Sequence, residues 1–389
     1  MKLGFYSCMS GVPWGGSEEL WWRTARRLQA SGHEVCVNYK WWPEPAKQLQ
    51  ELVAAGGQVW YREAPRSFWE RQRESVKKFL RPSNRKKGGW IDQARPESVL
   101  ITLGYHPDRV PIADELFERR IPYAINVQAA SHFFFIHSDC VPSYRRWYQN
   151  ASRVFFVSEE NQQKLETNLA MKLQNAEIVD NPFNVDPKRE VAWPEDDGVF
   201  RVACVGRIHF QSKGQDLVLD ALRRNFWRDK PIEVSFFGKD QGNLRQLEDL
   251  IRLYGLESQV RIAGFETDVS GIWKTHHALL LPSRYEGAAL VVVEAMLSNR
   301  IVIATDTGRN SELIDQGKTG FIAAGATTDL IDQAMRDAWQ VRQRWREMGE
   351  EAGRAIRQRY SIDPIADYAE KLLNLGRPAV RQSPAASLQ

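Results

Sequence analysis

Short apolar runs alternate along the chain with segments whose apolar residues recur at helical spacing. Between the first two runs, Leu20, Thr24 and Leu28 share one face of a predicted helix that Gly32 is expected to end. Near-continuous apolar strands that alternate with helices predict parallel sheets covered on both faces, so the fold class is α/β. The predicted strands are residues 2–7, 34–39, 58–61, 98–103, 123–127 and 153–158, then 200–206, 233–238, 261–265, 278–282, 301–305 and 319–323.

The alternation is interrupted once, by a charged, proline-containing stretch at 186–198. We therefore expect two doubly wound domains, 1–186 and 187–359, a division that suits a chain of 389 residues. A last helix is predicted at 360–375, and residues 376–389 are expected to be disordered.

The composition, with 43% hydrophobic and 26% charged residues, excludes a disordered, collagen-like or coiled-coil chain. Cys8, Cys36, Cys140 and Cys204 are far apart and form no CxxC pair, so we expect free thiols rather than disulfides or a metal site. No apolar run reaches the ~18–20 residues of a membrane span, and the first residues are typical of a strand rather than a signal peptide. The expected protein is soluble and cytoplasmic.

Two glutamates follow the predicted strand at 278–282. Glu286 lies in the loop and Glu294 on the next helix, and ligands of open α/β sheets bind outside the carboxyl ends of the strands. Each carboxylate can accept hydrogen bonds from a polyol such as a sugar or ribose. The backbone N–H groups of Ala288, Ala289 and Leu290 would face the crevice and suit a phosphate. The alternative is a solvated turn residue and a helix-capping residue.

Two cations follow the predicted strand at 200–206. Arg207 and Lys213 surround the loop before the next helix, where Arg as a fork and Lys as a point charge suit a diphosphate. Pairing with surface acids is the alternative.

A glycine loop, GVPWGGSEEL at 11–20, follows the first predicted strand. Gly15 and Gly16 let the backbone approach a ligand closely, and a helix is expected to begin at about Ser17 as its N-cap. The loop matches neither a Walker A motif nor GxGxxG, so NAD binding is disfavoured. A tight turn without a ligand is the alternative.

In this order the three elements resemble the retaining glycosyltransferases of family 4, whose GT-B fold has two Rossmann-like domains facing a central crevice. The resemblance covers most of 1–375 and is strongest from about 200 to 325. It rests on GGSEE, VGRIHFQSKGQDLVLDAL, ALLLPSRYEGAALVVVEAM and IATDTGRNSELIDQGKTGF.

The resemblance implies a role for each candidate residue. Glu286 would contact the donor sugar, Arg207 and Lys213 the diphosphate, and Glu294 the ribose. The last helix would cross back to the first domain. Further donor-binding positions implied by the resemblance are Gly15 and Gly16 near the distal phosphate, Gly238 and Phe265 near the nucleobase, and the backbone of Gly287, Ala288, Ala289 and Leu290.

The resemblance also implies a mechanism without a metal or other cofactor, in which a UDP- or GDP-linked hexose is the co-substrate. The departing phosphate would deprotonate the acceptor hydroxyl on the same face, so that configuration is retained. The cations and helix N–H groups would stabilise the charge that develops.

One position departs from the family pattern. A histidine often ends a strand of the first domain there, whereas this chain has Gln128, which can bind a sugar hydroxyl but cannot carry a proton. His132, four residues later, and His106 are the other crevice candidates for the acceptor or sugar. A loop histidine without a role is the alternative for His132. In GRNSE, Arg309 stands where the family often has a second glycine.

Positive charge is concentrated in residues 62–95, which hold eleven Lys or Arg and four acids, a net +7 in a chain of net +4. Apolar residues interleave with these charges, so the segment suits an anionic membrane surface or a phosphorylated acceptor. A solvated helix and loop is the alternative, and nucleic acid is disfavoured because no recognition motif is present. Four tryptophans can stack on acceptor sugars or pack in the core: Trp21, Trp22, Trp41 and Trp42.

The sequence thus favours a retaining glycosyltransferase acting on a saccharide or lipid-linked glycan. Peripheral binding to the inner face of a membrane is a further expectation. A nucleotide-sugar epimerase or hydrolase, and a degenerate nucleotide-sugar-binding protein, remain alternatives. The sequence does not indicate an oligomeric state.

Overall fold

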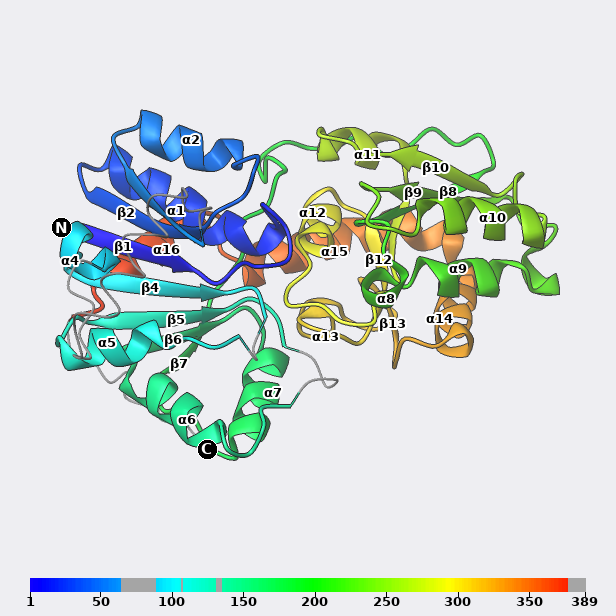
Figure 1. Ribbon diagram of the computed structural model, residues 1–389. Coiled ribbons are helices and arrows are strands. Elements are labelled where there is room, and N and C mark those ends of the chain that lie inside the picture. Colours follow the sequence, from blue (N-terminus) through cyan, green and yellow to red (C-terminus); the bar gives the residue numbers. More distant parts are fainter. Residues whose placement is uncertain (64–88, 106–107, 131–134, 377–389) are drawn as a thin grey trace, which may run out of the picture.

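Two parallel β-sheets, each covered by helices on both faces, make up the computed structural model (Figure 1). The structure describes residues 1–63, 89–105, 108–130 and 135–376. The α/β fold class and the two doubly wound sheets predicted from the apolar pattern are confirmed.

The first sheet has the strand order β3-β2-β1-β4-β5-β6-β7. Side chains alternate along the strands because successive residues point to opposite faces. Leu3 and Phe5 pack under α1, α2 and α16, whereas Val99 and Ile101 pack under α4 to α7. The strands are β1 (Lys2–Ser7), β2 (Glu34–Lys40), β3 (Gln58–Arg62), β4 (Ser98–Leu103), β5 (Tyr123–Val127), β6 (Arg153–Phe156) and β7 (Ala176–Ile178). The helices are α1 (Glu19–Ala30), α2 (Lys47–Ala54), α4 (Trp90–Ala94), α5 (Ile112–Glu118), α6 (Val141–Asn150) and α7 (Glu159–Leu169).

The second sheet repeats this topology in the order β10-β9-β8-β11-β12-β13. One face packs against α9, α10 and α14, and the other against α11, α12 and α15. The strands are β8 (Phe200–Val205), β9 (Ile232–Phe237), β10 (Val260–Gly264), β11 (Ala278–Leu281), β12 (Ile301–Thr305) and β13 (Gly320–Ala323). The helices are α8 (Phe210–Lys213), α9 (Gln215–Leu222), α10 (Leu244–Tyr254), α11 (Val269–Thr275), α12 (Leu290–Leu297), α13 (Asn310–Leu313), α14 (Thr328–Gln340), α15 (Trp345–Arg359) and α16 (Pro364–Leu373), with short 3₁₀ helices at Gly16–Glu18, Asn225–Trp227 and Arg342–Arg344.

Three local features differ from the prediction. β7 was missed, because its three half-buried residues at a sheet edge carry too little apolar signal. The last helix begins at Pro364, not at 360, because the Asp363 side chain caps it and proline suits a first helical position. Ser17 is not an N-cap: it lies within the 3₁₀ helix, and α1 begins at Glu19.

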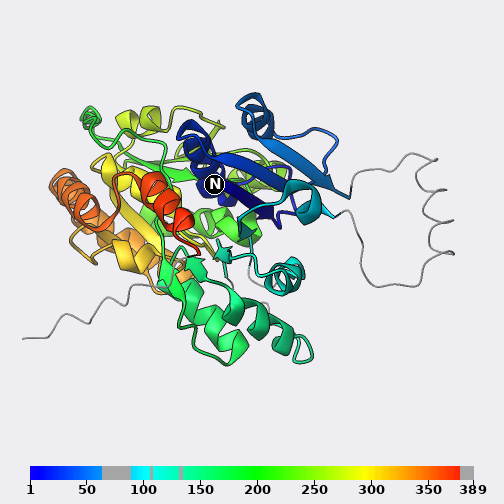
Figure 2. The same cartoon turned by 90° about the vertical axis from the view of Figure 1, so that its left-hand side faces the viewer.

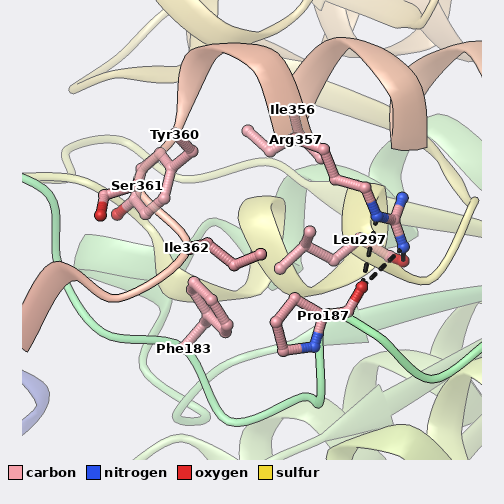
Figure 3. Close-up of a pocket in the computed structure, with 8 residues that line it drawn as sticks. All are labelled: Phe183, Pro187, Leu297, Ile356, Arg357, Tyr360, Ser361 and Ile362. Carbon is pink, nitrogen blue, oxygen red and sulfur yellow. Dashed lines mark hydrogen bonds between the residues drawn. The ribbon is translucent and has the colours of Figure 1, made fainter.

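The chain runs from one sheet to the other twice, and each of these connecting segments is called a crossing. After β7 it runs to β8, and after α15 it returns so that α16 lies beside α1 (Figure 2). A small, largely apolar pocket lies where the two crossings meet; Figure 3 shows Phe183 and Pro187 from one crossing facing Tyr360 and Ile362 from the other. The domain boundary at 186/187 itself stays a prediction.

A buried arginine holds the first crossing against the second sheet. Arg300 is 0% exposed and donates to the carbonyl oxygens of Trp273, His276 and Ala192, while its guanidinium stacks 4.9 Å from the ring centre of Trp193. Burial lowers the pKa of Arg300 to about 10. Backbone dipoles therefore balance this charge and fix the incoming chain.

A buried carboxyl group anchors the glycine loop of the first sheet. Glu18 is 0% exposed, and its Oε2 accepts hydrogen bonds from Ser7 Oγ at 2.7 Å and Trp21 Nε1 at 2.9 Å. Burial raises the pKa of Glu18 from 4.5 to about 7. The loop that holds Gly15 and Gly16 is thus tied to the end of β1 by a group that titrates near neutrality.

Glu18→Gln is expected to change how stability depends on pH. Between pH 4.5 and 7 the folded protein holds the Glu18 proton more tightly than the unfolded chain, so stability falls as pH rises through this window. The fall amounts to roughly 3 kcal/mol and is absent from the neutral glutamine variant. Urea unfolding at pH 5 and pH 8 measures the difference, with the exposed Glu51→Gln as control. Parallel pH profiles for wild type and Glu18→Gln would contradict the expectation.

Candidate functional site

An ion pair joins two loops at the carboxyl edge of the second sheet. Lys213 Nζ lies 2.5 Å from Glu286 Oε1, and Ser283 Oγ donates to the same oxygen at 2.7 Å. The side chains of Lys213 and Glu286 are 16% and 11% exposed. Two of the residues predicted to act on the donor are therefore in direct contact.

Backbone packing brings the two loops together. Gly214 ends α8 at φ +66°, and a side-chain carbon there would lie 2.1 Å from the carbonyl oxygen of Pro282. The Arg284 N–H donates to the Ser212 carbonyl at 2.9 Å, and its guanidinium pairs with Asp216 at 2.7 Å. Lys213 is thus presented to the loop that follows β11.

Arg207 lies on the same edge, directly after Gly206. Its side chain is exposed and donates to Gln241 Oε1 at 2.8 Å, while its carbonyl accepts from Gln215 Nε2. Burial and the charges of Arg207 and Lys213 lower the pKa of His209. The predicted diphosphate cations therefore flank a histidine whose pKa their charges lower.

The predicted nucleobase residues lie beside this cation cluster. At Gly238, with φ +156°, a side-chain carbon would lie 1.9 Å from the Gly206 carbonyl oxygen, so β8 and β9 end in close contact. Phe265 is 58% exposed, with Lys239 Nζ 4.4 Å from its ring centre. An exposed aromatic side chain with a lysine over its ring thus lies directly after β10.

The two sheets meet at Gly287. A side-chain carbon there would lie 1.7 Å from the Gln128 carbonyl oxygen and 3.2 Å from Val157. Ala288, next along the chain, packs against the core of the first sheet, and Ala289 precedes Leu290, the first residue of α12. The loop of Glu286 is therefore seated on the carboxyl ends of β5 and β6.

Gln128 contributes its backbone to this contact. Its side chain is 5% exposed and donates to Asn126 Oδ1 at 2.8 Å. His106 and His132 lie outside the described residues, so their predicted roles stay predictions. Tyr105, beside His106 in the chain, meets Tyr285 across the sheets with ring centres 6.5 Å apart.

Glu294 is buried within α12. It is 3% exposed, its Oε1 accepts from the Asn184 N–H at 3.0 Å and from Asn184 Nδ2 at 2.8 Å, and burial raises its pKa. Asn184 in turn accepts from Arg23, on α1 of the first sheet. Gly15 and the exposed Gly16 begin the 3₁₀ helix just before α1.

Further contacts hold the sheets together. Glu160 Oε2 accepts from the Gly308 N–H, and Arg309 pairs with Asp180. The Glu159 N–H donates to Glu312 Oε1 at 2.8 Å. Arg309, which stands where the family often has a glycine, therefore has an ion-pair partner, Asp180, in the crossing after β7.

The basic segment lies largely outside the described residues, so its predicted contact with an anionic surface stays a prediction. Arg62, at its start, does not face outward. It donates to the carbonyl oxygens of Asn38 and Ser7 and stacks on the Tyr6 ring at 4.2 Å. Trp21 lies in the core and is 1% exposed, so it has no free ring face on which an acceptor sugar could stack.

All four cysteines are free thiols. In the part of the chain that the structure describes, no group of three His, Cys, Asp or Glu side chains is placed to hold a metal ion. No helix within those same ranges is long and apolar enough to cross a membrane.

Several residues of the site were not found from the sequence. Ser283 and Thr307 fix Glu286, through its carboxylate and its N–H, and Gln241 fixes Arg207. Arg23 and Asn184 are joined to Glu294 from positions far away in the chain, so spacing carries no signal for them. The position of Ser283, between the strand and Glu286, is the one local clue.

Residues 199–340 match the family described as Glycosyl transferases group 1. Alpha-D-kanosaminyltransferase of Streptomyces kanamyceticus is 28% identical over 172 residues, which cover 43% of each chain. Lipopolysaccharide core biosynthesis mannosyltransferase LpcC of Rhizobium leguminosarum bv. viciae is 30% identical over 139 residues, 34% of this chain and 39% of that protein. The matches thus span about two fifths of these relatives' length.

The whole fold is shared with solved structures. Anabaena Alr3699/HepE in complex with UDP aligns with TM-score 0.73 and 18% identity, covering 96% of this chain and 100% of that chain. A glycosyltransferase from Rickettsia africae ESF-5 aligns with TM-score 0.75 and 14% identity, covering 97% and 100%. At these identities the likeness concerns the fold. The chain therefore has the predicted GT-B fold of two Rossmann-like domains, and residues 199–340 are similar to the glycosyl transferases group 1 family.

Proposed function

We propose that this protein is a retaining glycosyltransferase that moves a hexose from a UDP- or GDP-linked donor to a saccharide or lipid-linked glycan. The match at 199–340 and the transferase names of the relatives support the reaction class. UDP in the HepE complexes supports a nucleoside diphosphate donor. The glycan acceptor is supported by the lipopolysaccharide core mannosyltransferase among the relatives.

The observation that carries the proposal is the contact between Lys213 and Glu286. The ion pair holds the lysine at the carboxyl edge of β8 and β11, and Ser283 shares the same carboxylate oxygen. Glu286 Oε2 is then oriented to accept from hydroxyls of a donor sugar. A lysine cation, and a carboxylate that accepts hydrogen bonds from sugar hydroxyls, suit a sugar diphosphate when they are held this close together.

The proposed chemistry breaks the bond between the anomeric carbon and the diphosphate and forms a bond to the acceptor oxygen on the same face. The acceptor proton passes to the departing phosphate oxygen. Arg207, Lys213 and the N–H groups at the start of α12 stabilise the negative charge that develops on the leaving group. Glu294 would hold the ribose, and Gly16 would approach the distal phosphate from the opposite sheet.

A second candidate is a nucleotide-sugar-binding protein without turnover. Gln128, in place of the family histidine, cannot carry a proton, and its amide is bonded to Asn126. This candidate predicts nucleotide binding without transfer to any glycan of a broad acceptor panel. An epimerase or hydrolase would instead convert the donor in the absence of acceptor.

Glu286→Ala and Lys213→Ala are each expected to lower the transfer rate about 100-fold, because each removes a preorganised group that acts on the reacting sugar diphosphate. Initial rates with a radiolabelled donor measure the loss. Arg223→Ala, which removes an exposed ion pair with Asp220 on α9, is the matched control. Unchanged transfer by either site variant, with the control also unchanged, would contradict the assignment.

Binding of one nucleoside diphosphate is expected to raise the melting temperature. A ligand at 100 times its Kd adds about 2.7 kcal/mol to the stability of the native state. UDP, GDP and ADP tested one by one in a thermal-shift assay identify the base. A melting temperature unmoved by all three would contradict a donor site.

A further inference from the structure

A chain of hydrogen bonds runs from the glycine loop of the first sheet to the buried carboxylate of the second. Trp14 Nε1 donates to Glu19 Oε1 at 2.9 Å, and Arg23 Nε donates to Glu19 Oε2 at 2.9 Å. Arg23 Nη2 donates to Asn184 Oδ1 at 2.5 Å, and Asn184 Nδ2 donates to Glu294 Oε1 at 2.8 Å. The five side chains come from the loop before α1, from α1, from the crossing after β7, and from α12.

Arg23 fixes the orientation of the Asn184 amide. A guanidinium only donates and a carboxylate only accepts, so the Asn184 oxygen must face Arg23 and its nitrogen must face Glu294. Arg23 Nη1 also donates to the Phe183 carbonyl at 3.2 Å, which holds the backbone just before Asn184. The asparagine is thus constrained on both its side chain and its backbone.

The same contacts decide how Glu294 is presented. Both Asn184 donors bind Oε1, so these hydrogen bonds leave Oε2 to other donors. Burial raises the pKa of Glu294, and the Asn184 hydrogen bonds and the charge of Arg23 oppose that rise. The Asn184 hydrogen bonds and Arg23 therefore favour the ionised form of Glu294 against the effect of its burial, and an ionised carboxylate is the stronger acceptor for a hydroxyl.

We propose that Arg23 is a positioning residue for the donor: through Asn184 it aims Glu294 at the ribose, so that donor affinity depends on a residue of the opposite sheet. The inference rests on the proposed function, because it takes the ribose hydroxyls as the ligand of Glu294. The ligand class is a nucleoside diphosphate with intact 2′ and 3′ hydroxyls. At the other end of the hydrogen-bond chain, Glu19 and Trp14 connect Arg23 to the glycine loop.

The test compares two ligands on matched variants of the full chain. Calorimetry gives the Kd of UDP and of 2′,3′-dideoxy-UDP, or of the GDP or ADP pair if the thermal-shift assay selects that base. Arg23→Ala is expected to weaken UDP about tenfold, the equivalent of one lost hydrogen bond, but dideoxy-UDP less than about twofold. Asn184→Ala is expected to behave likewise, and the double variant to lose no more than either single variant.

Arg27→Ala is the matched control, since Arg27 lies four residues further along α1 and pairs with Asp363 at 3.0 Å. It removes a contact between α1 and α16 without touching Asn184, and both affinities are expected to stay within about twofold of wild type.

Three results would overturn the inference. If the Arg23→Ala variant binds UDP as tightly as the wild type does, Arg23 has no role in donor binding. If the variant loses equal affinity for UDP and for dideoxy-UDP, Arg23 supports the fold rather than the ribose contact. Additive losses in the double variant would show that Arg23 does not act through Asn184. Wild-type protein that binds no nucleoside diphosphate would overturn the proposed function as well, which separates that failure from the other three.

Discussion

One backbone contact, between Gly287 and Gln128, limits how closely the two sheets approach each other beside the candidate site. The loop after β11 approaches the end of β5 so closely that a side-chain carbon at 287 would lie 1.7 Å from the Gln128 carbonyl oxygen. Only glycine is compatible with that distance. Because Glu286 precedes this contact and α12 follows it, the separation of the two carboxyl edges is set at the same residue that positions the candidate site.

Charge is distributed unequally across this junction. The second sheet supplies Arg207, Lys213 and the start of α12, whereas Gln128 of the first sheet supplies an uncharged backbone carbonyl to the contact with Gly287. Lys213 and Glu286 form a half-buried ion pair in which each charge compensates the desolvation of the other. The pair therefore holds the lysine cation at the edge of the sheet even when no ligand is bound. Such an edge suits a strongly anionic partner that replaces part of that compensation.

The strands and the two-sheet fold were predictable because apolar runs such as FRVACV are local patterns. The proximity of Glu286 and Lys213 was also within reach, since both follow neighbouring strands. The contacts of Arg23 and Arg62 were not, because they join residues far apart in the chain that no spacing connects. Glu18 was missed for a related reason: its burial depends on Ser7 and Trp21 converging on it in three dimensions.

The return of α16 to the first sheet has a consequence for the order in which the protein is made. Tyr368, Ala369 and Leu372 belong to the same core cluster as Leu3, Phe5 and the residues of α1. A ribosome synthesises the whole second sheet before these residues emerge. One face of the first sheet's core is therefore complete only after the residues of the second sheet have been made, so the N-terminal domain cannot reach its full core packing before the C-terminal domain is synthesised.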